Sequence, residues 1–179
     1  TACVGAVVYV TLGASEAQSL WGDCDFDDVR LVYDITDVTE ADDYAYAFRS
    51  DGTATVLSYN GNAASLTVPS EVRGHTVTEI ASGAFKDCAA LTEIVIPDSV
   101  TRLGNGLFSG CVTLKSITLP FLGETASASK TFAQVTGLTD ACAVESVTLT
   151  AATELHYSAF EGYAKIKSIS LPDTLASAS

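Results

Sequence analysis

The residues best suited to covalent or metal chemistry are five cysteines, Cys3, Cys24, Cys88, Cys111 and Cys142. Cysteines that bind a metal or act in redox chemistry often occur as a Cys-x-x-Cys pair, and this chain has no such pair. The odd number also leaves at least one thiol unpaired. The spacing of the cysteines therefore predicts no metal centre and no redox motif.

A run of acidic residues imitates a calcium-binding loop. Asp23, Asp25, Asp27 and Asp34 fall near the ligand spacing of such a loop. Two departures count against calcium binding, because Asp28 stands where the sharp turn requires glycine and Asp34 replaces the usual bidentate glutamate. We therefore expect a solvated acidic segment.

Patterns typical of enzymes do not occur in the sequence. His75 and His156 have no metal ligand or nucleophile at a motif spacing, so we interpret both as ordinary loop residues. The motif Gly-x-Ser-x-Gly, the phosphate-binding loop and the dinucleotide fingerprint are all missing. The sequence therefore predicts a protein that is not an enzyme and has no catalytic residue, metal ligand or cofactor.

A spacing of 23 residues organises the middle of the chain. Residues 91–97 (LTEIVIP) are similar to residues 114–120 (LKSITLP), which lie 23 residues further along the chain. A fixed period of 20 to 30 residues indicates a structural unit that buries its apolar face by stacking on copies of itself. The sequence therefore predicts a solenoid. Six pairs of residues keep this spacing: Ile80 and Leu103, Phe85 and Phe108, Cys88 and Cys111, Leu91 and Leu114, Ile94 and Ile117, and Pro97 and Pro120.

Alternation within one repeat assigns side chains to the inside or the outside of a coil. Leu91, Ile94 and Ile96 should point inward, and Glu93 and Val95 outward. We expect a β-rich, right-handed superhelix in which parallel strands alternate with short helical turns. The predicted core consists of Ile80, Phe85, Cys88, Leu91, Ile94, Ile96, Leu103, Phe108, Cys111, Leu114, Ile117, Leu119, Phe160, Ile166, Ile169 and Leu171.

Cys88 and Cys111 should stack about 4.8 Å apart, because one repeat separates them. That separation lies within the Cα range of a disulfide, but the bond needs Cβ atoms roughly 3.8 Å apart. Parallel stacking keeps the Cβ atoms about as far apart as the Cα atoms. We therefore favour free thiols that pack as small apolar side chains, with a disulfide as the alternative.

The part of the chain before the repeats divides into two segments. Residues 1–17 contain a short apolar run that ends in a small-x-small pattern, which we interpret as a signal-peptide remnant; a buried first strand is the alternative. Residues 18–65 comprise the acidic segment and an N-terminal capping hairpin over residues 44–59. Its turn is Asp51-Gly52, a pair favoured where both turn residues have positive φ.

Residues 66–175 form the predicted solenoid, and two insertions interrupt it. A five-residue excess near residues 73–75 indicates a loop. Residues 121–143 are rich in alanine, serine, threonine and glycine, so we expect an insertion that loops outside the stack. We interpret residues 176–179 as a truncated end, because the repeat pattern starts another coil just before them.

The repeat motifs resemble the BspA-type leucine-rich repeat of bacterial surface proteins over about residues 44–175. The resemblance implies a leucine-rich-repeat solenoid that is secreted or displayed on a cell surface, in a family of large proteins implicated in adhesion. The motifs that carry it are residues 77–80 (VTEI), 84–88 (AFKDC) and 91–97 (LTEIVIP), which recur at residues 100–103 (VTRL), 108–111 (FSGC) and 114–120 (LKSITLP).

Composition narrows the classes of partner. The chain has 179 residues, and its 22 acidic and 9 basic side chains give a net charge of −13. Such a charge repels nucleic acids and anionic lipid surfaces. We therefore expect no nucleic-acid partner. The apolar run near the N-terminus is too short to span a membrane, so we also expect no membrane insertion of the mature domain.

The outward side chains of the parallel strands offer a contact surface. They are small, hydroxylated and mildly charged, without the large anchors that dominate tight interfaces. We therefore predict a non-catalytic extracellular protein-binding or adhesion module of a larger bacterial surface protein, whose partner is a host or cell-surface protein. A structural spacer without a ligand is the alternative. The candidate partner-contact ladder consists of Glu93, Val95, Lys115, Thr118, Glu145, Thr148 and Lys167.

Overall fold

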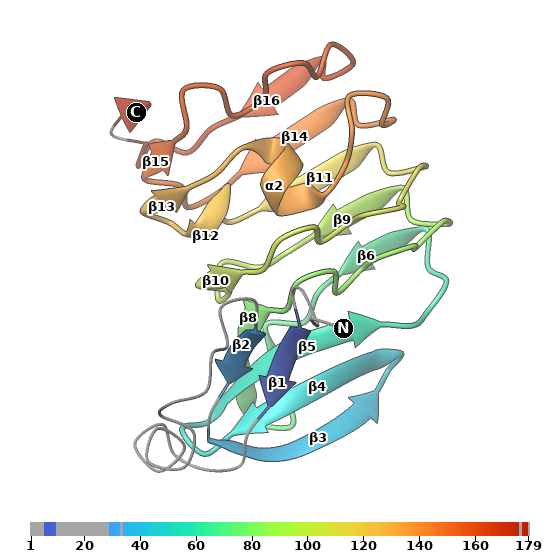
Figure 1. Cartoon of the computed structure of the whole chain (residues 1–179), viewed down its shortest axis with the longest axis vertical. Helices are drawn as coiled ribbons and strands as arrows, with labels where there is room; N and C mark the ends of the chain where they lie inside the picture. The colour runs from blue at the N-terminus through green and yellow to red at the C-terminus, as the bar shows by residue number, and fades with distance from the viewer. Residues whose placement is uncertain (1–5, 10–28, 33, 176, 179) are drawn as a thin grey trace.

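Five short parallel strands, one from each coil, form a ladder along the molecule (Figure 1). The structure is a computed structural model that describes residues 6–9, 29–32, 34–175 and 177–178. Each ladder strand is short because a coil turns sharply after it, so its backbone groups pair with neighbouring coils instead of a hairpin partner. In order along the sheet, the strands are β6 (Ser65–Thr67), β9 (Glu93–Val95), β11 (Ser116–Leu119), β14 (Ser146–Leu149) and β16 (Ser168–Ser170).

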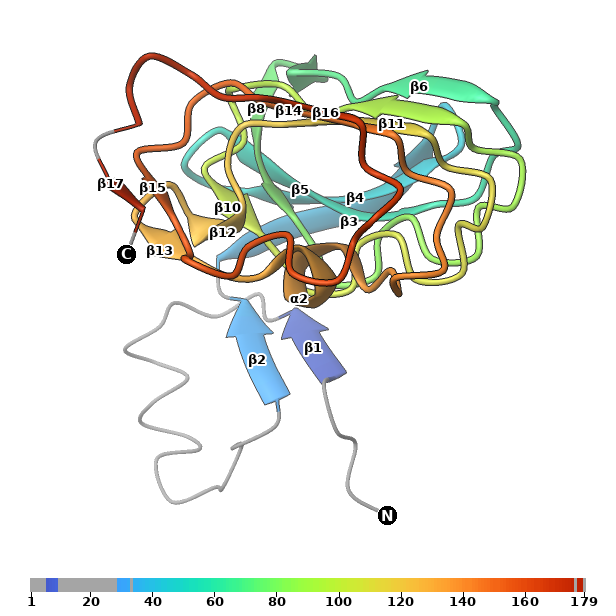
Figure 2. The ribbon, with the colours of Figure 1, turned by 90° about the horizontal axis from the view of Figure 1, so that it is seen from above.

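The coils superpose when the molecule is viewed along the stack (Figure 2). The ladder occupies one side, and the short turns and helix α2 (Phe132–Thr136) occupy the opposite side. Between them lies a core of stacked apolar side chains. Ile94 and Ile117 pair in adjacent strands and are fully buried, and the Phe85 and Phe108 rings lie 5.7 Å apart. The predicted 23-residue stacking of these residues is confirmed.

The N-terminal part of the stack is a second, mixed sheet. The strands β3 (Ile35–Ala41), β4 (Tyr44–Arg49) and β5 (Thr53–Tyr59) are antiparallel, whereas β8 (His75–Ile80) and β10 (Arg102–Leu103) continue the sheet in parallel. The sequence predicted the β4–β5 hairpin but not its third strand, β3.

The hairpin turn differs from the expected type. Only Gly52 of the Asp51-Gly52 pair has a positive φ, at 82°, so the expectation for both residues was wrong. Asp51 stabilises the turn in another way, because its Oδ1 accepts hydrogen bonds from the backbone N–H and the hydroxyl of Thr53 at 2.9 and 2.6 Å. These bonds hold the pKa of the Asp51 carboxyl below its usual range.

The excess of residues near 73–75 forms a second, smaller hairpin. Strand β7 (Glu71–Val72) pairs antiparallel with the start of β8, and the turn residues Arg73 and Gly74 both have positive φ. Positive φ costs little for glycine, which is why a two-residue turn is possible here. The predicted loop insertion is therefore a hairpin attached to the mixed sheet.

Residues 121–143 were expected to loop outside the stack, and that expectation was wrong. They form the hairpin β12 (Gly123–Thr125) and β13 (Ala128–Ser129) and then α2, and Phe132 and Val135 of this helix are fully buried. Backbone bonds from Leu107 to Val135 and from Phe108 to Thr136 join α2 to the preceding coil. The segment is thus a longer coil whose apolar residues fall at irregular spacing.

The last described coil is less buried than predicted. Phe160 and Ile166 are half-buried, and Ile169 and Leu171 are 42% and 43% exposed, so the core assignment of the last two was wrong. The physical reason is that β16 pairs with β14 alone among the described strands. A short parallel pair is formed by β15 (Glu154–Leu155) and β17 (Ser177–Ala178), in a sheet separate from the ladder.

The segment interpreted as a signal-peptide remnant falls mostly outside the described residues. Within it, Ala6–Tyr9 form strand β1, which pairs in parallel with β2 (Val29–Val32). In the described part of the chain no helix has the length and apolar character needed to cross a membrane.

Candidate protein-contact surface

The outward side chains of the ladder strands define one continuous surface, called here the ladder face. Its strands pair in the register that the repeat spacing predicts, so that residues from successive coils lie side by side. Inward residues such as Ile117 and Val147 are fully buried, whereas the outward residues between them keep contact with solvent. One row of the ladder face is Ser65, Glu93, Ser116, Ser146 and Ser168, and the next row is Thr67, Val95, Thr118, Thr148 and Ser170.

Beside these rows lie three charged residues at the start of successive strands, Lys115, Glu145 and Lys167. Lys167 Nζ donates to Glu145 Oε2 at 2.8 Å. This hydrogen bond lowers the pKa of the Glu145 carboxyl. Both partners are largely exposed, so the pair adds little stability but fixes where the two charges lie.

The hydroxyl groups of the ladder face partly satisfy one another. Ser168 donates to the Ser146 hydroxyl at 3.0 Å, and Ser65 donates to Glu93 at 3.4 Å. Such groups can also hydrogen-bond to a partner, but their small side chains bury little apolar area when they do. The ladder face can therefore support many weak polar contacts.

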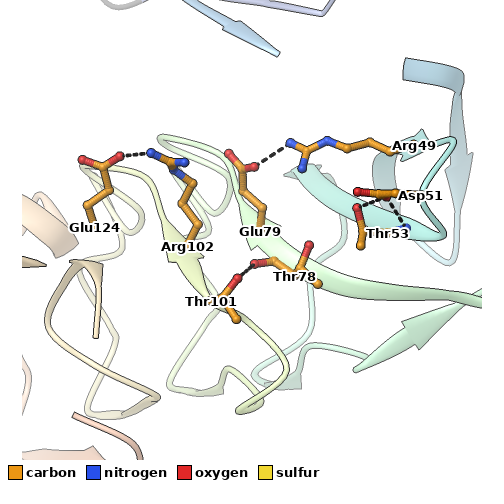
Figure 3. A network of polar contacts seen from close by, with 8 residues as sticks. All are labelled: Arg49, Asp51, Thr53, Thr78, Glu79, Thr101, Arg102 and Glu124. Atoms are coloured by element: carbon orange, nitrogen blue, oxygen red, sulfur yellow. Dashed lines mark hydrogen bonds and ion pairs between the residues drawn. The ribbon is translucent and has the colours of Figure 1, made fainter. Parts of the chain in front are cut away.

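Sequence reasoning missed a second row of polar residues, called here the charged row, which crosses the mixed sheet and continues to strand β12 beyond it (Figure 3). It consists of Arg49 on β4, Glu79 on β8, Arg102 on β10 and Glu124 on β12, with alternating charge. Arg49 Nη2 donates to Glu79 Oε2 at 2.7 Å, and Arg102 pairs with Glu124. Strand register places Arg102 opposite Glu79, and the 23-residue step between them could have revealed the row.

The cysteines of the described coils are free thiols. Cys111 is fully buried, and its Sγ donates to the backbone oxygen of Phe85 at 3.0 Å. Burial raises the pKa of the Cys111 thiol to about 11 and also raises that of the half-buried Cys88. Cys142 is buried one coil further along. A high pKa disfavours the thiolate, so Cys88 and Cys111 are poorly suited to nucleophilic chemistry.

The two histidines have local structural roles. The His75 ring packs edge-on against Phe48 at 4.9 Å. His156 Nδ1 lies 3.2 Å from the backbone nitrogen and 3.0 Å from the hydroxyl oxygen of Ser158, inside a tight turn. Within the described ranges, no three metal-ligating side chains gather at one point. The acidic residues from Asp23 to Asp28 lie outside those ranges.

Comparison with known sequences identifies the repeats. The sequence profile described as "BspA type Leucine rich repeat region" matches six copies over residues 56–179, more than half of the chain. A search of curated proteins found no significant match.

Several solved structures are similar to this chain. A leucine rich cell surface protein from Faecalibacterium prausnitzii A2-165 is 19% identical, with a TM-score of 0.49; the match covers 79% of this chain and 41% of that one. A T. pallidum leucine rich repeat protein is 21% identical over 76% of this chain and 84% of its own, with a TM-score of 0.44. A leucine-rich repeat protein from Bacteroides capillosus is 18% identical over 79% and 96%, with a TM-score of 0.43.

Proposed function

Because this chain belongs to the BspA-type leucine-rich repeat family, we propose that it is a non-catalytic protein-binding or adhesion module of a secreted or surface-exposed bacterial protein. Its partner would be a host or cell-surface protein. The observation that carries the proposal is the ladder face, a continuous row-by-row surface that five coils keep in register.

Binding by the ladder face would be weak for each copy. The face offers hydroxyl groups and a few charges such as Lys115 and Lys167, but none of the aromatic anchors that dominate tight interfaces. Repeated copies compensate, because effective concentration raises avidity by roughly 10²- to 10⁴-fold without a new kind of contact. The module would therefore act as one unit of a multivalent array.

The superhelix is proposed to be right-handed, and the β3–β4–β5 sheet is proposed to cap its first coil. Tyr44, Tyr46 and Phe48 support the capping role, since their rings pack into the same core as Phe85. Solenoids need such a cap, because the first coil would otherwise expose its apolar interior.

A binding experiment tests the proposed contact surface. The chain and a tandem array of it are passed over a panel of immobilised extracellular host proteins, and dissociation constants are measured by biolayer interferometry. We expect binding by the array and weak or undetectable binding by the single chain. Nanomolar binding by the single chain would contradict the multivalent interpretation.

Charge reversal then locates the contact. Lys115→Glu with Lys167→Glu should weaken binding if the ladder face makes the contact. The matched control is Arg73→Glu with Lys86→Glu, which changes the net charge equally at exposed sites outside the ladder strands. Equal effects of the two double variants would show that general charge, and not the ladder face, governs binding.

A structural spacer is the second candidate function. The absence of large anchors from the ladder face favours it, because a surface without such anchors can simply be soluble. Failure of both the single chain and the array to bind across a broad panel would support the spacer.

A further inference from the structure

The link between the β3–β4–β5 sheet and the first ladder strand contains an asparagine followed by a glycine. This pair, Asn60-Gly61, comes directly after β5 and leads toward β6, outside regular secondary structure. Asparagine is chemically labile before glycine, because a residue without a side chain lets its backbone nitrogen approach the asparagine side chain. The chain has one other such pair, Asn105-Gly106. The two pairs are identical in sequence, so a difference in their reactivity must come from the fold.

At the first pair, the atoms that would react have no hydrogen bond to hold them apart. The Asn60 backbone N–H donates to the Asp43 oxygen at 2.7 Å, and the Ala63 N–H donates to the Tyr59 hydroxyl at 3.3 Å. These two bonds hold the ends of the segment. Between them, the exposed Asn60 side chain and the Gly61 N–H have no hydrogen-bond partner among the described residues. No competing bond therefore opposes an approach of the Gly61 nitrogen to the Asn60 side chain.

Packing requires glycine at position 61. A Cβ atom there would lie 2.3 Å from the Tyr59 hydroxyl oxygen. Tyr59 is 7% exposed, and its ring lies 4.8 Å from that of Tyr44 and 6.4 Å from that of Phe85. The Tyr59 ring cannot move aside without disturbing this core. The fold therefore excludes the bulkier residues that would slow a reaction at Asn60.

At the second pair, both reacting groups are engaged by neighbouring coils. Asn105 Oδ1 accepts a hydrogen bond from Lys130 Nζ at 3.0 Å, and the Asn105 N–H donates to the Ser82 hydroxyl at 3.1 Å. The Gly106 N–H donates to the backbone oxygen of Gln134 at 3.0 Å, so it is directed toward helix α2. Reaction at Asn105 would have to break these bonds first.

We propose that Asn60 is a site of spontaneous deamidation, a modification that accumulates as the protein ages, and that the fold protects Asn105 from it. The Gly61 nitrogen forms a bond to the Asn60 Cγ, and the bond from Cγ to the amide nitrogen breaks. The amide nitrogen takes the Gly61 proton and leaves as ammonia, which leaves a five-membered cyclic imide. Water then opens the imide at one of its two carbonyl groups and gives aspartate or isoaspartate. Water is the only co-reactant in this sequence.

The product changes the link between β5 and β6. Asp43 Oδ2 would lie 2.8 Å from a Cβ at position 61, so the new carboxylate forms close to an existing one and repels it. Isoaspartate also adds one methylene group to the backbone of the link. Both changes should weaken the attachment of the β3–β4–β5 sheet to the ladder. The modification does not depend on whether the ladder face binds a partner.

Peptide mapping by mass spectrometry tests the proposal, because trypsin separates the two pairs into residues 50–73 and 103–115. The folded chain and the urea-unfolded chain are incubated in parallel at mildly alkaline pH and physiological temperature. In the folded chain, the first peptide should deamidate at least several-fold faster than the second; in urea, the two rates should be similar. Equal rates in the folded chain, or a rate for the first peptide far below its rate in urea, would overturn the proposal.

Glutamine variants identify the residue within the first peptide. Glutamine reacts far more slowly than asparagine, because its longer side chain must close a six-membered ring. Asn60→Gln should therefore remove the mass change from residues 50–73. The matched control is Asn62→Gln, an equally exposed position followed by alanine, and it should leave the change in place. Persistence of the change in the Asn60 variant would overturn the assignment.

Thermal unfolding measures the consequence of the modification. The aged chain should unfold at a lower temperature than the fresh chain, and also lower than a fresh Asn60→Asp variant, which carries the new charge without the extra methylene group. Aged Asn60→Gln is the control for other chemical changes, and it should keep the midpoint of its fresh counterpart. An aged chain that is modified at Asn60 but as stable as the fresh chain would overturn the weakening proposed for the β5–β6 link.

Discussion

Glu79 carries a charge into the interior of the mixed sheet, where it is 3% exposed. Arg49 compensates that charge at 2.7 Å, and its own side chain is 20% exposed. The Arg102–Glu124 pair lies in the same charged row, but both side chains are more than 40% exposed. The two Arg–Glu pairs therefore lie in environments of different polarity. We expect them to contribute differently to the free energy of unfolding.

Replacing the glutamate of each pair in turn measures how much each pair contributes to the free energy of unfolding. Glu79→Gln should lower the free energy of unfolding by about 3 kcal/mol, because Arg49 would keep a partly buried charge without its counter-charge. Glu124→Gln is the matched control and should cost less than about 1 kcal/mol, because water screens the exposed pair. Urea unfolding followed by circular dichroism gives both values. Similar losses in the two variants would contradict the distinction between buried and exposed pairs.

The Cys111 thiol should make stability depend on alkaline pH. Its pKa of about 11 in the folded chain exceeds its ordinary value of 9.0, so folding favours the protonated thiol. This contribution is fully present below pH 9 and is lost as the pH rises toward 11. The loss is about 2 to 3 kcal/mol, and a Cys111→Ala variant should lack this part of the pH dependence.

Thiol labelling provides an independent check. At pH 8 the native chain should react slowly at Cys111 with an aromatic disulfide reagent, and the urea-unfolded chain should react at once. Recovery of a peptide that links Cys88 to Cys111 after non-reducing digestion would instead show a disulfide.

At the scale of elements, stability should depend on stacking between coils. Phe108→Ala should cost about 3 to 5 kcal/mol, because its ring is fully buried against Phe85 and leaves a cavity. Val112→Ala, four residues further along, should change stability by less than about 0.5 kcal/mol, because Val112 is 69% exposed. Thermal unfolding of the two variants distinguishes them. A large loss in the Val112 variant would mean that this side chain is covered.

Elements with a fixed period could be predicted from the sequence, and the others could not. Ile94 and Ile117 keep the 23-residue step, which is why their strand register was predicted correctly. Residues 121–143 have no period, because a helix and a hairpin there bring Phe132 and Val135 into the core at spacings that no other coil uses. Burial there is decided by contacts between coils, which a single-sequence pattern does not contain.

The candidate surfaces also differ in whether the sequence alone predicts them. Rows of the ladder face follow from the 23-residue period, so the sequence alone predicts them. The charged row could not be predicted as a whole, because only the folded mixed sheet brings Arg49 of β4 beside Glu79 of β8.

At the scale of the whole molecule, the net charge of −13 should govern how salt affects stability. Salt screens attraction within pairs such as Lys167–Glu145, which lowers stability slightly. It also screens repulsion among the carboxylates that have no basic partner, which raises stability. The second effect should dominate, because 22 acidic side chains face only 9 basic ones.

We therefore expect the thermal midpoint to rise as sodium chloride is increased from about 10 to 200 mM, a range over which the screening length falls from roughly 30 to 7 Å. Calcium chloride at matched ionic strength separates general screening from specific binding. A ligand that binds only the folded chain must raise its apparent stability further. We expect no such additional rise, because the acidic segment departs from a calcium loop at Asp28 and Asp34. An extra rise that disappears when Asp23 and Asp25 are changed to asparagine would instead identify a calcium site in that segment.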